Sequence, residues 1–224
     1  MTAKIFQNNC PPLPANEFFT SFARGKWERS QWLNVKGPRF SYVLEMLQQE
    51  DHIVNPTPDE PDEVIQKDYI MEVYSSLVLN RRIEGDAVIS SKMSFDYQLA
   101  PVLVIAPELG ISSDGKYPEF REHYETVLYN QGINIWHHVY QNGKPDCYMA
   151  ACLKASFLPK TVYDLQVEIS FTPRGCQLFA RCDGHEIGYT ALSITEKSYY
   201  AGLTACEGRN RFYDFKVTEP KKES

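Results

Sequence analysis

The sequence predicts an all-β protein, an antiparallel two-sheet sandwich, and three observations support this prediction. Short β-rich runs recur from residue 70 onward, dipeptides typical of tight turns separate several of them, and the second half contains no long amphipathic helix. Regular short strands with turns between them are typical of sandwiches and barrels. No linker divides the chain into two core-forming halves, so we expect a single domain over residues 1–224.

Turn signals define the expected strands. Asn142-Gly143 and Asp183-Gly184 suit two-residue hairpins, because both central positions of such a turn need a positive φ. Asp114-Gly115 and Arg174-Gly175 indicate two further turns. The strands expected around these turns are 87–99, 101–106, 123–130, 132–140, 161–171, 176–182, 199–205 and 211–217.

Alternating side chains show which strands have one buried face. In 161–171, Leu165, Val167 and Ile169 alternate with polar residues. Successive side chains of a strand point to opposite faces, so the apolar set is expected to face the core. By the same rule, Arg211, Tyr213 and Phe215 should share one face of the last strand.

The first 70 residues are less regular. The prolines of residues 1–25 predict an extended, irregular N-terminal arm, followed by strand-like runs at 27–35 and 40–47. Residues 55–63 form a proline-rich acidic loop, which we interpret as a solvated connection. Structural calcium is the alternative there, because clustered carboxylates suit a hard cation. The tail, 219–224, is expected to be frayed.

Composition excludes several classes of function. Hydrophobic content of 43% and charged content of 23% are those of an ordinary globular protein. A net charge of −6 argues against a nucleic-acid partner, which needs a basic surface. No apolar run approaches the ~20 residues of a membrane span, so we expect no membrane partner.

The N-terminal residues and the cysteines together suggest a compartment. The first 19 residues lack a charged segment followed by an apolar one, so we expect no secretory signal and a cytoplasmic location. In that setting the six cysteines are expected to be reduced thiols. Their spacing does not match a zinc motif, and we predict no metal site and no cofactor.

The segment 132-GINIWHHVYQNGK-144 holds the most informative candidate site. On a strand, His137 shares a face with Ile133 and Ile135, whereas His138 shares the opposite face with Asn134 and Trp136. Adjacent histidines on a strand therefore do not share a metal easily.

The face of Asn134, Trp136 and His138 suits a sugar. An indole stacks on the apolar face of a pyranose, and the amide and imidazole beside it bind hydroxyl groups. The alternative is a Trp136 packed under a loop, with His138 at the surface beside it. Tyr129, Tyr213 and Arg81 (or its neighbour Arg82) are further candidates for the same ligand surface.

Catalysis is possible but no motif requires it. The chain has no GxSxG, GxxxxGK[ST], GxGxxG or HExxH pattern, so hydrolase-triad, nucleotide and zincin chemistry lack local support. Carboxylates such as Glu125 could serve a glycosidase. If the protein is an enzyme, we expect His138 and Glu125 to be its acid/base pair.

Residues 85–217 resemble the concanavalin A-like lectin/glucanase superfamily, including its laminin G-like members. The resemblance rests on 101-PVLVIAPE-108, 124-YETVLYNQGINIWHH-138, 183-DGHEIGY-189 and 199-YYAGLTACEGRNRFYDFKV-217. It implies a jelly roll of two curved sheets with ligands on the concave face. The ExDxxE strand of the retaining glucanases has no counterpart, because Glu60-Pro61-Asp62-Glu63 lies in a proline loop with Ile65 in the last position. Their catalytic residues cannot be carried over.

These observations lead to two hypotheses about function. The first is a protein that recognises a carbohydrate or glycoside on the concave sheet, with hydrolysis or another glycan modification as a possible activity. The alternative is a non-catalytic accessory domain whose exposed aromatic residues bind a protein partner. The fold hosts both classes, so the shape of the surface around Trp136 has to discriminate between them.

Overall fold

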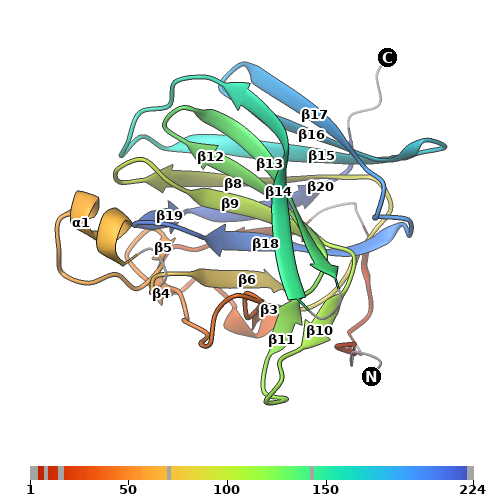
Figure 1. Cartoon of the computed structure of the whole chain (residues 1–224), viewed down its shortest axis with the longest axis horizontal. Helices are drawn as coiled ribbons and strands as arrows, with labels where there is room; N and C mark the ends of the chain where they lie inside the picture. Colours follow the sequence, from red (N-terminus) through yellow and green to blue (C-terminus); the bar gives the residue numbers. More distant parts are fainter. Residues whose placement is uncertain (1–4, 8–9, 15–17, 70–71, 142–143, 221–224) are drawn as a thin grey trace.

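The computed structural model describes residues 5–7, 10–14, 18–69, 72–141 and 144–220. Two large β-sheets pack against each other (Figure 1). Strands account for 54% of the described residues and helix for 5%, which confirms the prediction of an all-β sandwich.

Within the described residues, the first sheet contains nine strands, and it provides the floor of the site described below. Its main path runs through β1 (Leu13–Pro14), β7 (Ile83–Glu84), β18 (Ser198–Ala205), β9 (Pro101–Ala106), β12 (His123–Tyr129), β13 (Gly132–Gln141) and β14 (Lys144–Lys154). Strands β6 (Ser75–Leu79) and β3 (Trp32–Asn34) extend it from β18. The short β1–β7 pair is parallel, and the other named pairs are antiparallel.

The second sheet also has nine strands and covers the inner face of the first. Its path runs through β17 (His185–Ala191), β16 (Gly175–Cys182), β15 (Tyr163–Thr172), β8 (Ala87–Phe95), β19 (Asn210–Phe212), β5 (Ile53–Val54) and β4 (Leu47–Gln48). Strands β20 (Asp214–Thr218) and β2 (Phe18–Ser21) join it at β8. The remaining elements are the hairpin of β10 (Leu109–Ile111) and β11 (Pro118–Phe120), the helix α1 (Asp62–Asp68) and the 3-10 turn η1 (Arg29–Gln31).

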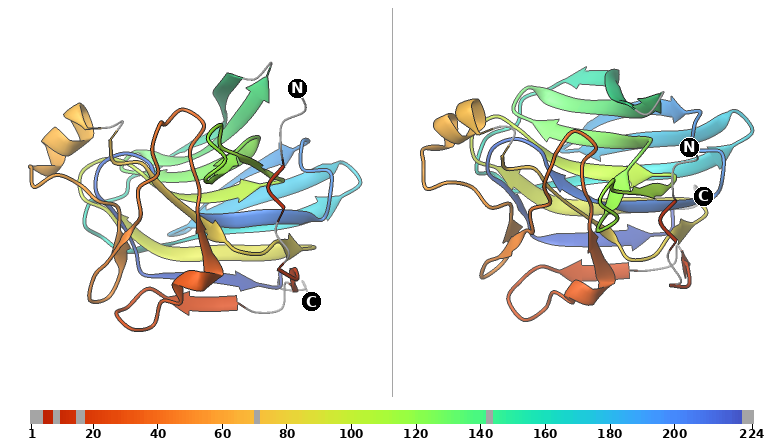
Figure 2. Two further views of the ribbon diagram at one scale, coloured as in Figure 1. Left: turned by 90° about the horizontal axis from the view of Figure 1, so that it is seen from below. Right: turned by 60° about the horizontal axis from the view of Figure 1, so that its bottom comes forward.

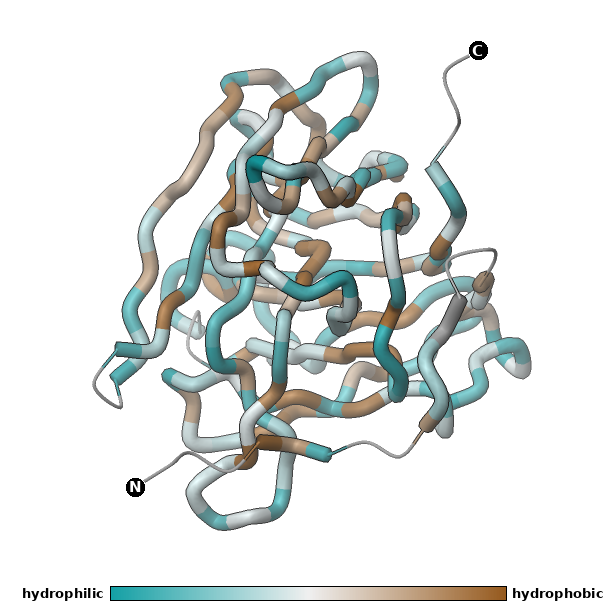
Figure 3. Tube along the Cα trace, turned by 90° about the vertical axis from the view of Figure 1, so that its right-hand side faces the viewer, coloured by the Kyte–Doolittle hydropathy of each residue, from teal (hydrophilic) through white to brown (hydrophobic). Residues whose placement is uncertain are grey.

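The core lies between the two sheets and follows the predicted alternation. Leu165, Val167 and Ile169 of β15 are fully buried, as are Ile133 and Ile135 of β13 on the facing sheet. Figure 3 shows hydrophobic residues (brown) in the interior of the molecule and hydrophilic residues (teal) in many of the outer turns. Burial of one face of each strand fixes the strand register, because a slip by one residue would place the apolar side chains in water.

The last predicted strand, 211–217, is divided into two. Phe212 and Phe215 are both fully buried, which regular alternation forbids. Phe212 pairs with Met93 and Lys216 with Ser90, so four steps on one strand match three on the other. This extra residue is a β-bulge, and it corrects the expectation that Arg211, Tyr213 and Phe215 share a face.

The N-terminal arm is shorter than predicted. Strand β2 lies within the expected arm of residues 1–25, pairs with β20, and leads into Phe22, which is fully buried. The segment Phe18–Ser21 therefore belongs to the second sheet. Residues 1–4, 8–9 and 15–17 of the arm, and 221–224 of the tail, lie outside the described residues. Of the runs 27–35 and 40–47, only Trp32–Asn34 and the end at Leu47 are strands.

The acidic loop 55–63 is attached to the body at both ends. Asn55 is buried and donates to the carbonyl oxygens of Val73 and Gly208. Asp62 begins α1 and pairs with Arg209 at 2.6 Å and with Lys160 at 3.3 Å. The expectation of a freely solvated connection is wrong at these two positions, because their polar side chains bind protein groups.

One predicted hairpin can be checked directly. Asp183 and Gly184 have φ values of 49° and 76° and connect β16 to β17, as the two-residue turn requires. The turn at Asn142-Gly143 lies outside the described residues. No helix in the described part of the chain is long and apolar enough to cross a membrane.

Gly132 at the start of β13 provides a test of the sheet. Its φ is 152°, and a Cβ there would lie 1.9 Å from the backbone oxygen of Leu153 on β14. We expect Gly132→Ala to destabilise the protein by about 1–3 kcal/mol or more, the cost of overpacking, measured by urea denaturation. Gly188→Ala is the control, because its Cβ would meet only the movable ring of Phe179 and should cost less. Equal losses would contradict this account.

The cysteines provide a second test. The structure has each of the six as a thiol, in agreement with the sequence. Burial raises the pKa of Cys176 and of Cys182 to about 12, whereas Cys152 is exposed. Thiolate is the reactive form, so at about pH 8 a thiol reagent should label Cys152 in the native protein and leave the two buried thiols unmodified. Unfolding without reductant should release all six, and any shortfall would show a disulfide.

Candidate functional site

The site is built on the outer face of β12 and β13. Their register places Glu125 opposite Trp136 and His123 opposite His138. The inward side chains, such as Tyr124, belong to the core between the sheets. The alternate side chains therefore collect on the outer face, where they are available to a ligand.

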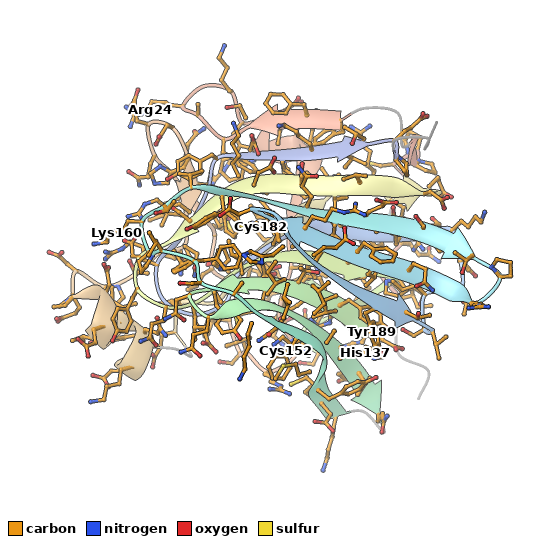
Figure 4. All side chains as sticks on the ribbon, turned by 90° about the horizontal axis from the view of Figure 1, so that it is seen from above. Arg24, His137, Cys152, Lys160, Cys182 and Tyr189 are labelled. Carbon is orange, nitrogen blue, oxygen red and sulfur yellow. The ribbon has the colours of Figure 1, made fainter. Side chains whose placement is uncertain are left out.

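Trp136-His137-His138 divides between the two faces as predicted. His137 turns inward, stacks on Tyr124 with ring centroids 4.2 Å apart, and hydrogen-bonds Tyr148 and Glu122 at 2.5 and 2.7 Å. Figure 4 labels His137 and Tyr189 on the same side of the molecule, and the rings of both pack against Tyr124. Trp136 and His138 point the other way and line a cavity together with Asn134. His137 is therefore a packing residue.

Glu125 connects two histidines on the outer face. Its carboxylate lies 3.1 Å from Nε2 of His138 and 3.5 Å from Nε2 of His123. The two imidazole rings stack with centroids 4.3 Å apart and an interplanar angle of 14°. Glu125 and His123 are nearly inaccessible, and the His138 side chain is 18% exposed at the cavity wall. The structure thus brings together the predicted pair His138 and Glu125.

The protonation of this cluster follows from burial and from charge. Burial alone would raise the pKa of Glu125, but the imidazoles of His138 and His123 outweigh it and hold that pKa well below its usual range. Burial lowers the pKa of His123, although the hydrogen bond to Glu125 opposes this. The site therefore holds an ionised carboxylate in a place that water barely reaches.

Two adjoining cavities form a groove over this face. One, of about 300 Å³, lies over Asn134 and Trp136, and the other, of about 190 Å³, lies over His123. Both border Glu125 and His138, so the carboxylate–imidazole pair lies where the cavities meet. We call the two cavities together the groove.

A long loop, residues 35–46, makes one wall of the groove. Figure 2 shows this loop (orange-red) rising over the outer face of the first sheet. Phe40 anchors the loop by stacking on Tyr74, with ring centroids 4.2 Å apart. Arg39 donates to Sγ of Cys147 on β14 at 2.8 Å. The loop therefore connects Tyr74, directly before β6, with β14 and borders the cavity over Glu125.

The turn after β18 supplies residues that sequence reasoning missed. Glu207 and Cys206 border both cavities. In the sequence, residues 207–210 stand out only as the region before the last strand. Burial raises the pKa of Glu207, and the nearby charge of Glu125 raises it further. Burial also raises the pKa of Cys206 well above its usual value. Glu207 is thus a second carboxylate in the groove, in an environment opposite to that of Glu125.

The other predicted ligand residues do not all reach the groove. Tyr129 lines it beside Asn134. Tyr213 lies in the second sheet, where its ring contacts His52, and Arg81 borders neither cavity. Arg82 is bound to Ser198 and lines a separate polar cavity of about 410 Å³. The assignment of Tyr213 and Arg81 to this surface is wrong, because each follows a strand on a different part of the sandwich.

One buried polar atom beside the groove lacks a hydrogen-bond partner. Oδ1 of Asn134 is buried and has no hydrogen-bond partner, while its residue lines the cavity over Trp136. A buried acceptor without a partner is costly, so Asn134 is under a constraint that the apolar residues of the cavity wall are not.

Comparison with solved structures supports the architecture. The carbohydrate binding module CBM66 from Bacillus subtilis superposes with a TM-score of 0.54 and 11% identity, covering 93% of this chain and 100% of that one. A legume lectin-like domain from Entamoeba histolytica gives 0.56 and 10%, covering 90% and 97%. Beta-agarase A from Zobellia galactanivorans gives 0.57 and 10%, covering 95% and 98%.

The chain has the concanavalin A-like fold. At these identities the likeness concerns the fold alone. No family model matches the chain, and no curated protein matches it. The jelly-roll architecture expected from the resemblance is confirmed, and the function has to be argued from the groove itself.

Proposed function

We propose that the protein binds a carbohydrate in the groove, with Trp136 as the stacking platform. The observation that supports this most directly is the shared position of Trp136, Asn134 and His138 along one cavity wall. A half-buried indole offers its face to the apolar side of a pyranose, and the amide and imidazole beside it can bind hydroxyl groups. The three solved structures above include two whose names describe carbohydrate binding or a lectin.

The shape of the surface favours this hypothesis over protein contact. Protein partners are usually bound on broad patches with exposed aromatic anchors. Here the indole borders a cavity that also holds buried polar groups, among them Asn134 and Glu125. A small polyhydroxylated ligand can enter such a cavity and hydrogen-bond its polar lining, whereas a flat protein surface would not reach into it.

Trp136→Ala tests the proposal. Trp136 is partly buried and packs against the small cluster of Ala100, Val102 and Val127, outside the main core. We expect the substitution to abolish glycan binding, measured by calorimetry after a glycoside panel has identified a ligand, with the melting temperature little changed. A core tryptophan would instead cost ~3–5 kcal/mol. Trp136→Phe should retain part of the affinity, because a smaller ring can still stack.

His137→Ala is the matched control for that experiment. Its imidazole stacks on Tyr124 and binds Glu122 on the inner face, so its loss should lower stability without a selective loss of binding. Unchanged glycan binding in Trp136→Ala, or equal losses of binding at both positions, would contradict the proposal.

Glycoside hydrolysis is a second candidate, favoured by two carboxylates on one groove. Glu125 and Glu207 both border both cavities. Glycosidases generally use a pair of carboxyl groups on opposite sides of the scissile bond. Glu207→Gln should then stop hydrolysis of a bound glycoside, assayed by release of reducing sugar, while leaving its binding in place. A ligand that binds and is never cleaved by the wild-type chain would restrict the function to recognition.

A further inference from the structure

We propose that His123, Glu125 and His138 bind a divalent transition metal ion at the floor of the groove, with an open coordination position facing the cavity. Among the residues that the structure describes, these three form the only group of potential metal ligands whose donor atoms converge, all within 4.8 Å of one another. They come from two paired strands, so the backbone register holds them in place. Neither adjacency in sequence nor a known motif indicates this site.

The distances match a small coordination sphere. Zinc binds nitrogen and oxygen at about 2.0–2.2 Å, which places neighbouring ligands of a tetrahedral site about 3.4 Å apart. The Glu125 carboxylate lies 3.1 Å from Nε2 of His138 and 3.5 Å from Nε2 of His123. Binding of one ion by both rings requires them to leave their near-parallel stack. His138 is the ring expected to tilt, because it is the more exposed of the two.

The hydrogen bonding of His123 directs one ring nitrogen to the site. Nδ1 of His123 lies 2.9 Å from the carbonyl oxygen of Arg121, which can only accept, so this nitrogen carries a proton. In the neutral ring, Nε2 then presents a lone pair toward Glu125. A backbone carbonyl that fixes the tautomer in this way is the usual outer partner of a metal-binding histidine.

A metal ion could take the place of the proton in this cluster. Nε2 of His123 and a carboxylate oxygen of Glu125 lie 3.5 Å apart, and either a shared proton or a metal ion between them supplies the positive charge that two facing acceptors need. Both groups are almost completely buried, so water does not screen their interaction. A buried carboxylate needs a partner charge, and a metal ion would contact Glu125 and both imidazoles at once.

The donor set selects the class of metal. Two imidazoles and one carboxylate suit zinc and its neighbours in the first transition row, whereas calcium and magnesium prefer oxygen ligands. Glu125 and His138 border both cavities, so the remaining coordination position would open into the groove. Three protein ligands with an open fourth position allow the ion to bind water or an oxygen of a ligand.

Titration with metal alone tests the proposal. The full chain, freed of metal by a chelator, is titrated with Zn²⁺ by calorimetry, and the Co²⁺ form is examined by visible absorption. We expect one ion per chain and a d–d spectrum of low-symmetry coordination with nitrogen and oxygen ligands. Glu125→Gln and His138→Gln should each weaken binding by more than the roughly 10–100-fold typical for loss of an outer partner.

His137→Gln is the matched control, because it removes a neighbouring imidazole of the same strand that faces inward. It should retain the wild-type affinity for Zn²⁺, as should Cys147→Ser, which alters a thiol at the cavity wall. Circular dichroism confirms that each variant is folded. Absence of binding to the wild-type chain overturns the proposal. Unchanged affinity for Zn²⁺ in folded Glu125→Gln and His138→Gln also overturns it. A loss of affinity in His137→Gln as large as in those two variants does so as well.

The metal site does not depend on the proposed carbohydrate binding. No glycan is present in the titration, so metal binding can be found in a protein that binds no sugar. Conversely, Trp136→Ala leaves all three metal ligands in place and should keep its affinity for Zn²⁺. The two proposals can therefore fail separately.

Discussion

The pairing of β12 with β13 is the constraint on which the rest of the site depends. One register places Ile133 and Ile135 in the core and, by alternation, sets Asn134, Trp136 and His138 on the outer face. A shift by one residue would exchange these sets, exposing isoleucines and burying polar groups without partners. Core packing therefore specifies the groove indirectly. Burial of the hydrophobic face supplies free energy of folding. The hydrogen bonds between β12 and β13 that hold this face in register also position the residues of the functional face.

Much of the fold could be predicted from short stretches of sequence, because strand alternation and tight turns depend on neighbouring residues. The alternation of Leu165, Val167 and Ile169 predicted β15, and Asp183-Gly184 predicted the turn between β16 and β17. The strand Lys144–Lys154 was missed because it shows no regular burial pattern. It lies at the edge of the sheet, and its pairing is irregular opposite Ile135 and Trp136. The bulge after Phe212 was also invisible, because its extra residue is defined only by the partner strand β8.

The candidate site shows the same limit at the level of single residues. Sequence reasoning placed Trp136, Asn134 and His138 on one face, because that depends on one strand alone. His123 was missed, although the strands 123–130 and 132–140 were both predicted and a tight connection between them pairs His123 with His138. Glu207 and the loop 35–46 had no such signal. Their approach to the groove depends on the packing of segments that lie far apart in the chain.

The walls of the groove come from segments that lie far apart in the sequence, so the groove exists only in the complete fold. Its lining comes from residues near 39, 100, 125, 136, 147 and 206, so no short fragment of the chain contains it. A truncated chain or a peptide from β13 would present the indole without the enclosure that surrounds it. Occupancy of the groove should also stabilise the native state as a whole, because only the complete fold offers the binding surface and the unfolded chain offers none.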